Sequence, residues 1–213
     1  SVVAVGGMKA GSILVSTDGI VWTAAEVPPG HFPLHVARAL GSFMAGGPSG
    51  FLTSESGRVW QAIPSPPDWN GVADIAGHGE AAVVLGTDGR CAVWDGAWHE
   101  LPAAPVVGDL ASNGDAIVVA SEGAWVLDGE DAWIQVSTSS WTDPTPDSRE
   151  DHWDALWDGG RFWVVCPAGL ASSVDGRDWI VEHVDFDAAL WAECSPPVIW
   201  DQWILPEGSF GDW

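Results

Sequence analysis

Tyrosine is absent from the 213 residues, and basic residues are scarce: seven Lys and Arg stand against 30 Asp and Glu, for a formal net charge of −23. A protein that binds a nucleic-acid backbone uses Lys and Arg to release counterions from the phosphates. The composition therefore predicts no nucleic-acid partner. Basic protein surfaces, divalent cations and neutral ligands stay open as partners, and the negative charge favours solubility.

Cysteine and long apolar runs are also lacking. Cys91, Cys166 and Cys194 are far apart with no CxxC pair, so their spacing suggests neither a zinc site nor a disulfide framework. A single bridge between Cys166 and Cys194 stays open. No apolar run approaches the ~18 residues of a membrane span, and the first residues, SVVAVGG, lack the charged flank of a signal peptide. We predict no membrane association.

Glycine and proline are abundant, with 26 and 15 copies, and 46% of the residues are apolar. This balance is typical of a folded, turn-rich chain, and the length suits one domain over residues 1–213. No segment has a convincing helical period, because Gly or Pro interrupts almost every window of about ten residues. The sequence predicts an all-β protein.

The chain has sixteen tryptophans, and six of them recur at regular intervals. Six of them follow a turn that contains Gly or Asp, at intervals of 38, 38, 35, 46 and 34 residues: Trp22, Trp60, Trp98, Trp133, Trp179 and Trp213. Repeats of this length indicate propellers or solenoids. One insertion accounts for the long interval.

Each interval contains short runs of Val, Ala, Ile and Trp separated by Asp-Gly or Asn-Gly, which are the sequence signals of β-hairpins. Four-stranded meanders repeated in this way describe the blades of a β-propeller. We predict six blades, of which the first and last are incomplete. The alternative is five blades, with residues 188–194 supplying the inner strand that the first blade lacks.

The phrase STDGIVW returns as SESGRVW and SVDGRDW. It resembles the Asp-box, or BNR, repeat found in propellers of the sialidase kind, at the turn between the third and fourth strands. The resemblance implies that Ser and Asp hydrogen-bond the turn while the aromatic ring packs between blades. The residues concerned are Ser16, Asp18, Trp22, Ser54, Trp60, Ser173, Asp175 and Trp179. Ser56 stands where the second copy would have Asp.

The resemblance to sialidases implies an active site with an arginine triad, a tyrosine nucleophile, a glutamate partner and an aspartate that acts as acid and base. This chain has no tyrosine, and Arg58 and Arg177 lie inside the box turns, on the side away from the usual ligand face. We therefore predict no sialidase chemistry and no enzymatic activity. A degenerate glycoside hydrolase with two carboxylates stays an alternative, although no spacing singles out a pair.

The insertion at residues 137–154 is the most distinctive segment, because long polar loops on a rigid scaffold often carry function. Its candidate binding residues are Trp141, Asp143, Asp147, Asp151, His152 and Trp153. Two interpretations stay open. One is a sugar site, or a calcium site with calcium as the cofactor. The other is a solvated acidic loop, which the absence of an EF-hand ligand pattern favours. Trp69, in PPDWNG, is a further aromatic anchor candidate.

Fold does not determine activity, so function follows by elimination. We predict a non-enzymatic binding or scaffold protein that contacts other proteins or a glycan, and that can form a homo-oligomer. The composition resembles that of propellers from bacteriophages of high-GC hosts, which implies a structural component of the virion, such as a tail, fibre or decoration protein. The alternative is a secreted or surface lectin. The predicted location is therefore a virion or the extracellular space.

Overall fold

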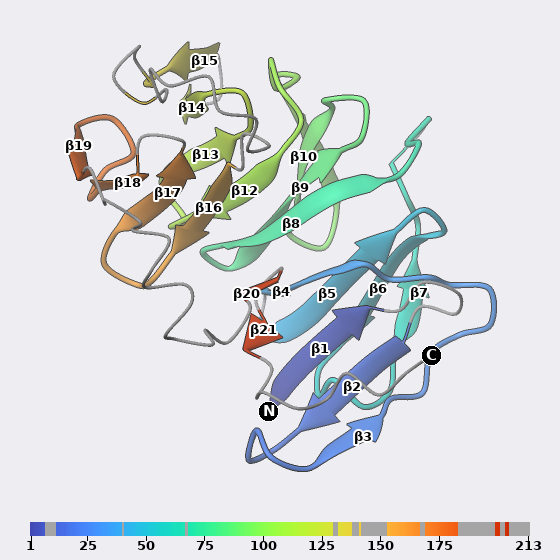
Figure 1. The fold of residues 1–213 in the computed structure, drawn as a ribbon. Coiled ribbons are helices and arrows are strands. Elements are labelled where there is room, and N and C mark those ends of the chain that lie inside the picture. Colours follow the sequence, from blue (N-terminus) through green and yellow to red (C-terminus); the bar gives the residue numbers. More distant parts are fainter. Residues whose placement is uncertain are drawn as a thin grey trace.

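The computed structural model describes residues 1–6, 12–39, 41–66, 68–129, 132–137, 141, 153–166, 169–182, 199–200 and 203–204. Five antiparallel sheets and one short hairpin follow one another along the chain (Figure 1). We call the five sheets blades 1 to 5. No α-helix occurs in the described ranges, and none of their segments is a helix long and apolar enough to cross a membrane.

The strands follow the chain in order. Blade 1 contains β1 (Val2–Gly6), β2 (Ser12–Ser16) and β3 (Trp22–Ala24). Blade 2 contains β4 (His35–Ala39), β5 (Ser42–Gly47), β6 (Gly50–Ser54) and β7 (Gln61–Ile63). Blade 3 contains β8 (Val72–His78), β9 (Ala81–Gly86), β10 (Cys91–Trp94) and β11 (Trp98–Leu101). Blade 4 contains β12 (Asp109–Ser112), β13 (Ile117–Ala120), β14 (Ala124–Asp128) and β15 (Ala132–Gln135). Blade 5 contains β16 (Asp154–Trp157), β17 (Phe162–Cys166), β18 (Gly169–Ser173) and β19 (Trp179–Glu182).

The hairpin pairs β20 (Ile199–Trp200) with β21 (Trp203–Ile204). Five sheets and this hairpin agree with the prediction of six blades of which the first and last are incomplete, since in the described residues blade 1 has three strands and the hairpin two. Residues 188–194, assigned to an inner strand in the five-blade alternative, lie outside the described residues.

Strand register shows which strand blade 1 lacks. Ser16 ends β2 opposite Val2, as Ser54 ends β6 opposite Phe43 and Ser173 ends β18 opposite Phe162. The strands β1, β2 and β3 thus correspond to the second, third and fourth strands of the other blades. Among the described residues, the strand that blade 1 lacks is the first one. In the other blades this first strand contacts the equivalent strand of its neighbour: β4 lies against β8, β8 against β12, and β12 against β16.

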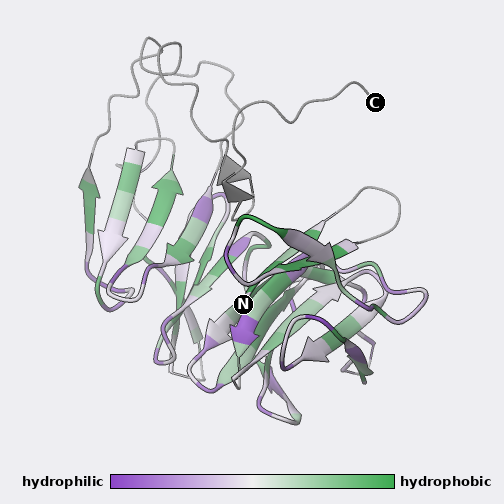
Figure 2. Ribbon diagram, turned by 90° about the horizontal axis from the view of Figure 1, so that it is seen from below, coloured by the Kyte–Doolittle hydropathy of each residue, from purple (hydrophilic) through white to green (hydrophobic). Residues whose placement is uncertain are grey.

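The core consists of apolar layers between successive blades. One cluster joins blades 3 and 4 through Val83, Leu85, Leu110 and Val119, and the other blade pairs have similar clusters. Figure 2 shows hydrophobic residues along the middle of the strands and hydrophilic residues toward the turns. Burial on both faces explains why the second strands read as continuous apolar runs such as AAVVLG.

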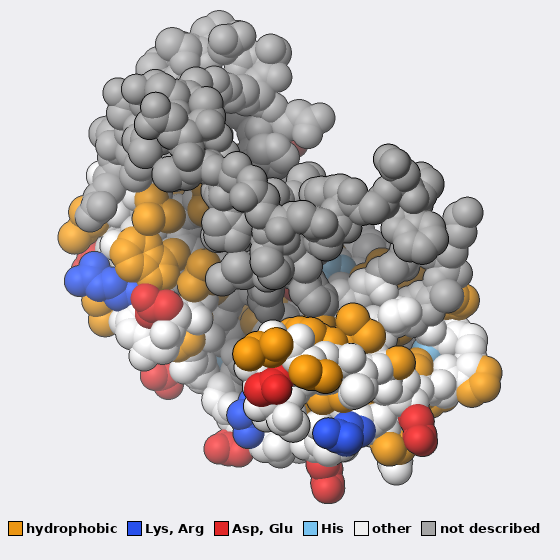
Figure 3. Space-filling model, turned by 60° about the horizontal axis from the view of Figure 1, so that its bottom comes forward, with side chains coloured by type: hydrophobic (Ala, Val, Ile, Leu, Met, Phe, Trp, Pro, Cys, Tyr) orange, Lys and Arg blue, Asp and Glu red, His pale blue; other side chains and the backbone are white. Residues whose placement is uncertain are grey.

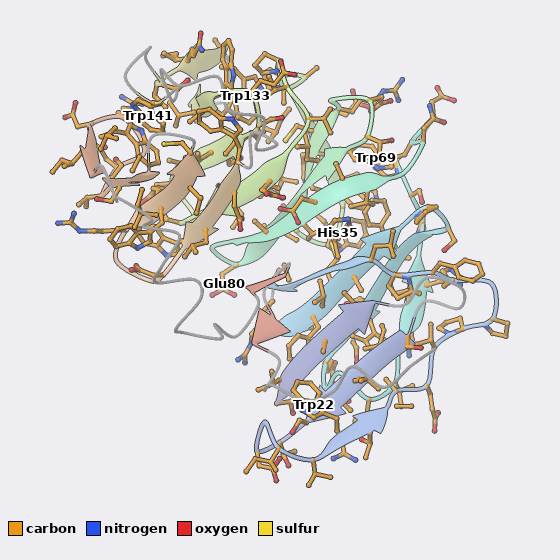
Figure 4. The ribbon with its side chains drawn as sticks, viewed as in Figure 1. Trp22, His35, Trp69, Glu80, Trp133 and Trp141 are labelled. Carbon is orange, nitrogen blue, oxygen red and sulfur yellow. The ribbon has the colours of Figure 1, made fainter. Side chains whose placement is uncertain are left out.

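One carboxylate links three first strands. Asp74 Oδ1 lies 3.3 Å from His35 Nδ1, and Oδ2 accepts the Leu110 backbone N–H at 2.7 Å. Both side chains of the pair are less than one-fifth exposed. Figure 4 labels His35 between the sheets of blades 2 and 3. Because a mostly buried carboxylate is costly without partners, these contacts fix the relative positions of β4, β8 and β12.

Candidate functional site

The turn between the third and fourth strands has the same hydrogen bonds in blades 1, 2 and 5. A buried serine ends the third strand, and its hydroxyl oxygen accepts the backbone N–H of the glycine three residues later. The donors are Gly19, Gly57 and Gly176, at 2.8, 2.9 and 2.9 Å from the oxygens of Ser16, Ser54 and Ser173. We call this arrangement the box turn, and the end of each blade on which it lies the box end.

The third position of the box turn also organises the backbone. Asp18 accepts the N–H groups of Ile20 and Val21 at 2.9 Å each, and Asp175 accepts those of Arg177 and Asp178. Hydrogen bonds from these backbone N–H groups lower the pKa of both carboxyl groups, because they favour the ionised form.

The glycine of the box turn packs on the preceding blade. A Cβ on Gly57 would lie 2.5 Å from Val3 Cγ2 and 3.3 Å from Val15 Cγ2 in blade 1. A Cβ on Gly176 would lie 3.4 Å from Val118 Cγ2 and 3.3 Å from Val126 Cγ2 in blade 4. Both glycines have a backbone φ of +79°, a value that residues with a side chain rarely adopt. The box turn therefore covers one pair of valines on its neighbour.

Tryptophan N–H groups are satisfied in two ways. In the box turns, Trp22, Trp60 and Trp179 donate to the carbonyl of the box glycine, at 3.1, 2.8 and 2.7 Å. In blades 3 and 4, Trp98 and Trp133 donate to carbonyls of the preceding linkers, those of Pro64 and Pro102, at 2.6 and 2.9 Å. Blades without a box turn thus dock through a different contact.

Blades 3 and 4 lack the box serine. Strand register puts Trp94 and Leu127 at its position, opposite Ala82 and Ile117. Neither side chain carries a hydroxyl to accept the turn N–H. In blade 3, Val93 pairs with Val83, as Val15 pairs with Val3 and Val126 with Val118 in the blades that a box glycine covers.

A groove replaces that contact between blades 3 and 4. The volume of this groove is about 850 Å³. Val93 lines the groove, whereas the equivalent valines of blades 1 and 4 contact a box glycine. The other described lining residues come from the strand ends and turns of both blades: His78, Asp95, Trp98, His99, Glu100, Leu101, Gly114, Asp115, Ile117, Leu127 and Gly129. We call this the interblade groove. It has an apolar floor and a polar rim with three carboxylates.

His78, at the end of β8, has a defined hydrogen bond on the groove wall. Its Nδ1 lies 2.6 Å from the hydroxyl of Ser112, which donates to the Ala116 carbonyl at 3.0 Å. Because a hydroxyl has one hydrogen to donate, this geometry places the imidazole hydrogen on Nδ1 and leaves Nε2 as an acceptor. Burial lowers the pKa of His78, although the charge of Asp115 opposes this shift.

The carboxylates of the rim differ in their partners. Asp95 accepts the Ala97 N–H at 3.1 Å and lies 3.1 Å from His99 Nε2, and these contacts lower its pKa, the backbone hydrogen bond contributing most. Within the described ranges, the carboxylates of Glu100 and Asp115 have no hydrogen bond or ion pair. These two carboxylates can therefore take a ligand without breaking an existing contact.

Metal chemistry finds no support in this part of the chain. Among the described residues, no three His, Cys, Asp or Glu side chains are grouped closely enough to hold an ion. The predicted calcium ligands Asp143, Asp147, Asp151 and His152 lie outside the described residues. A calcium site stays a prediction.

The two tryptophans predicted to bind a ligand from the insertion lie in or against the core. Trp141 is only 2% exposed, stacks on Trp153 with ring centroids 6.4 Å apart, and meets the Trp179 ring edge-on at 5.3 Å. Burial leaves the Trp141 ring no open face for a sugar, and Trp153 is half-buried in the same cluster. The predicted role of Trp141 needs this correction, because an exposed aromatic was expected. Figure 4 labels Trp141 and Trp133 in the region of blades 4 and 5.

Trp69, the other predicted anchor, is half-buried beside blade 2. Its ring stacks on Trp98 at 6.3 Å and meets Phe51 edge-on at 6.0 Å, and its buried indole N–H has no hydrogen-bond partner among the described residues. Trp69 thus packs against Trp98, which lines the groove, but is itself absent from the described lining. Cys91 is buried in the core, and burial raises the pKa of its thiol to about 12, as expected of a core residue.

Sequence reasoning missed the groove. His78, His99 and Asp115 belong to segments that were assigned to ordinary strands and turns, since nothing in their local spacing marks a site. The available signal was the replacement of the box serine by Trp94 and Leu127 in adjacent blades. On the face shown in Figure 3, hydrophobic side chains of the described residues are interspersed with charged ones.

Comparisons with known proteins identify the fold. No family model and no curated protein matches this chain. The structure of YCF48 bound to D1 peptide matches with a TM-score of 0.55 and 19% identity, over 80% of this chain and 60% of that one. The WD40 propeller domain of Doa1 matches with 0.56 and 14%, over 84% and 63%. Virginiamycin B lyase from Staphylococcus aureus matches with 0.57 and 12%, over 76% and 58%.

The chain therefore spans less than two thirds of the length of each of these proteins. At such low identity the likeness concerns the fold alone. Together with the repeated antiparallel sheets and their contacting first strands, it shows that this chain has the β-propeller fold.

Proposed function

We propose that this protein is a non-catalytic β-propeller that binds a segment of a partner protein in the interblade groove. One observation carries the proposal: the valine that a box glycine covers in blade 1 (Val15) and in blade 4 (Val126) corresponds in blade 3 to Val93, which lines the groove instead, while its strand partner Val83 is fully buried. A groove of mixed polar and apolar lining between two blades is a place for another chain to pack.

The size and chemistry of the groove suit a short stretch of polypeptide. Its volume of about 850 Å³ lies within the range of ligand sites, roughly 300–1,000 Å³. The partly buried Val93 and Leu101 offer contacts for aliphatic side chains, while the polar rim can bond the backbone or polar groups of the bound segment. A mixed surface of this kind is typical of protein interfaces.

Some structural neighbours support a binding role and others do not decide it. YCF48 has a peptide bound in its structure, whereas virginiamycin B lyase is by its name an enzyme. The lack of tyrosine in this chain supports the absence of sialidase chemistry. A structural role in a virion, an extracellular location, glycan binding and homo-oligomer formation stay predictions.

The test compares peptide binding by the full chain and by a variant with a filled groove. The purified protein is applied to an array of random peptides and to a glycan array. Val93→Trp places a large ring in the groove, and Val107→Trp is the matched control, since Val107 is exposed in the linker between β11 and β12. We expect the natural chain and Val107→Trp to bind the same peptides and Val93→Trp to lose them.

A second variant tests the same proposal independently, in case Val93→Trp fails to fold. Replacing residues 127–133, LDGEDAW, by SVDGRDW installs a box turn of the same length in blade 4. We expect this change to cover Val93 and remove peptide binding. Binding of a glycan without any peptide, or peptide binding that survives both groove variants, would overturn the proposal.

A further inference from the structure

We infer, building on the proposed function, that the interblade groove holds a basic side chain of the bound segment, an arginine or a lysine. The groove lies in a chain with a formal charge of −23, and its rim carries Asp95, Glu100 and Asp115. No Lys or Arg is among its described lining residues. A cationic group entering the groove is therefore attracted by fixed carboxylates without meeting a fixed cation.

Two of these carboxylates are open to a ligand. Glu100 and Asp115 come from different blades, Glu100 from β11 and Asp115 from the turn after β12. Neither forms a hydrogen bond or ion pair with a described residue through its side chain. A charge-assisted hydrogen bond to a guanidinium or ammonium group would satisfy oxygen atoms that otherwise bond only water.

His78 adds a neutral acceptor on the wall of the groove. Its Nδ1 hydrogen points to the Ser112 hydroxyl, so Nε2 has a lone pair to offer. The imidazole is partly buried and close enough to Asp115 for their charges to interact. An N–H donor from a basic side chain matches this acceptor, whereas an acidic side chain would face carboxylates and a lone pair.

The apolar floor distinguishes a basic side chain from a metal ion. Lys and Arg have long aliphatic stems that pack on apolar surface while the charged head reaches polar groups. Val93 and Leu101, both partly buried, provide that surface above the buried side chains of Ile117 and Leu127. Among the described residues, no three His, Cys, Asp or Glu side chains are grouped closely enough to hold a metal ion. The arrangement therefore favours an extended cation.

The experiment measures selection between two peptide pools by the full-length protein. Both pools are seven residues long with the same mixture of Ala, Val, Leu and Thr at the flanking positions. The central residue is arginine in one pool and citrulline, its neutral isostere, in the other. The pools compete for immobilised protein at ~150 mM salt, which screens weak attraction to the acidic surface, and mass spectrometry gives the ratio captured.

We expect arginine peptides to be enriched about tenfold or more, the ratio that one charge-assisted hydrogen bond gives. Asp115→Asn should reduce the enrichment severalfold. Glu122→Gln is the control with the same charge change, because Glu122 is exposed in the turn after β13, at the other end of blade 4. It should leave the enrichment unchanged.

The other outcomes separate the two proposals. Equal capture of both pools that is lost in Val93→Trp would overturn the basic-side-chain inference and leave the peptide groove standing. Enrichment that persists in both Val93→Trp and Asp115→Asn would show attraction to the acidic surface at large, and would also overturn the inference. Capture of neither pool would overturn it too, while the random peptide array decides the groove separately.

Discussion

The box serine of blade 2 provides a quantitative test of how the blades are held. Ser54 is 4% exposed, and its hydroxyl oxygen accepts the Gly57 N–H at 2.9 Å in a buried environment. Ser54→Ala removes the acceptor and leaves that N–H without a partner. The glycine cannot move away easily, because it packs against Val3 and Val15 of blade 1.

The expected cost follows from the unsatisfied donor. A buried polar group that loses its partner destabilises a protein by about 1–3 kcal/mol. For a chain of this size, 1 kcal/mol shifts the melting temperature by about 2–4 °C, so a loss of ~2 kcal/mol gives roughly 4–8 °C. Ser56→Ala is the control: Ser56 accepts the Arg58 N–H at 3.2 Å in an exposed position, where water can replace it. We expect the control to cost less than about 0.5 kcal/mol.

Urea unfolding monitored by tryptophan fluorescence measures both variants, since Trp60 lies in the same turn. We expect Ser54→Ala to lower the midpoint with an unchanged slope, and Ser56→Ala to follow the natural chain. Equal midpoints for all three proteins would refute the reasoning. A loss in Ser56→Ala as large as that in Ser54→Ala would refute it as well.

Three further predictions concern other parts of the fold. Asp74→Ala leaves the Leu110 N–H unpaired and removes the link between first strands, so it should lower the free energy of unfolding by about 1.5–3 kcal/mol in urea titrations; no change would contradict the proposed link. Asp18 and Asp175 have lowered pKa values in the folded state, so the stability they contribute is present above the usual Asp pKa of about 3.9 and is lost as pH falls through the lower folded values. The double Asn variant should therefore be less stable than the natural chain at pH 7 and lose less stability between pH 5 and pH 2, measured by urea midpoints. Cys91, with a thiol pKa of about 12, should resist iodoacetamide at pH 8 until the chain is unfolded, as peptide mass mapping will show; rapid labelling of the folded protein would contradict its burial.

Much of the fold could be predicted from the sequence because the information is local. Asp-Gly and Asn-Gly pairs define the hairpins, and the recurring tryptophans give the period of the blades. The three-stranded first blade follows from the same pattern. Strand register then showed which strand is missing, and this required the observed pairing of Ser16 with Val2.

The candidate site could not be predicted in this way, because it depends on contacts between blades. Val93 is one of many strand valines in the sequence, and only its alignment with Val15 and Val126 shows that it lacks a covering glycine. The error over Trp141 has a related cause. A tryptophan in a polar insertion resembles an exposed anchor, but its ring packs against Trp153 and Trp179, at 2% exposure.

The central claim is that a partner segment binds between blades 3 and 4, and photo-crosslinking tests it most directly. An arginine peptide from the captured pool, with photo-leucine at one flanking position, is irradiated with the full chain, and crosslinked residues are mapped by mass spectrometry. A segment bound in the groove should crosslink within residues 93–101 and 114–129, which contain most of the groove lining, and these crosslinks should be lost in Val93→Trp. Crosslinks concentrated in the insertion at residues 137–154, or spread evenly over the chain, would contradict it.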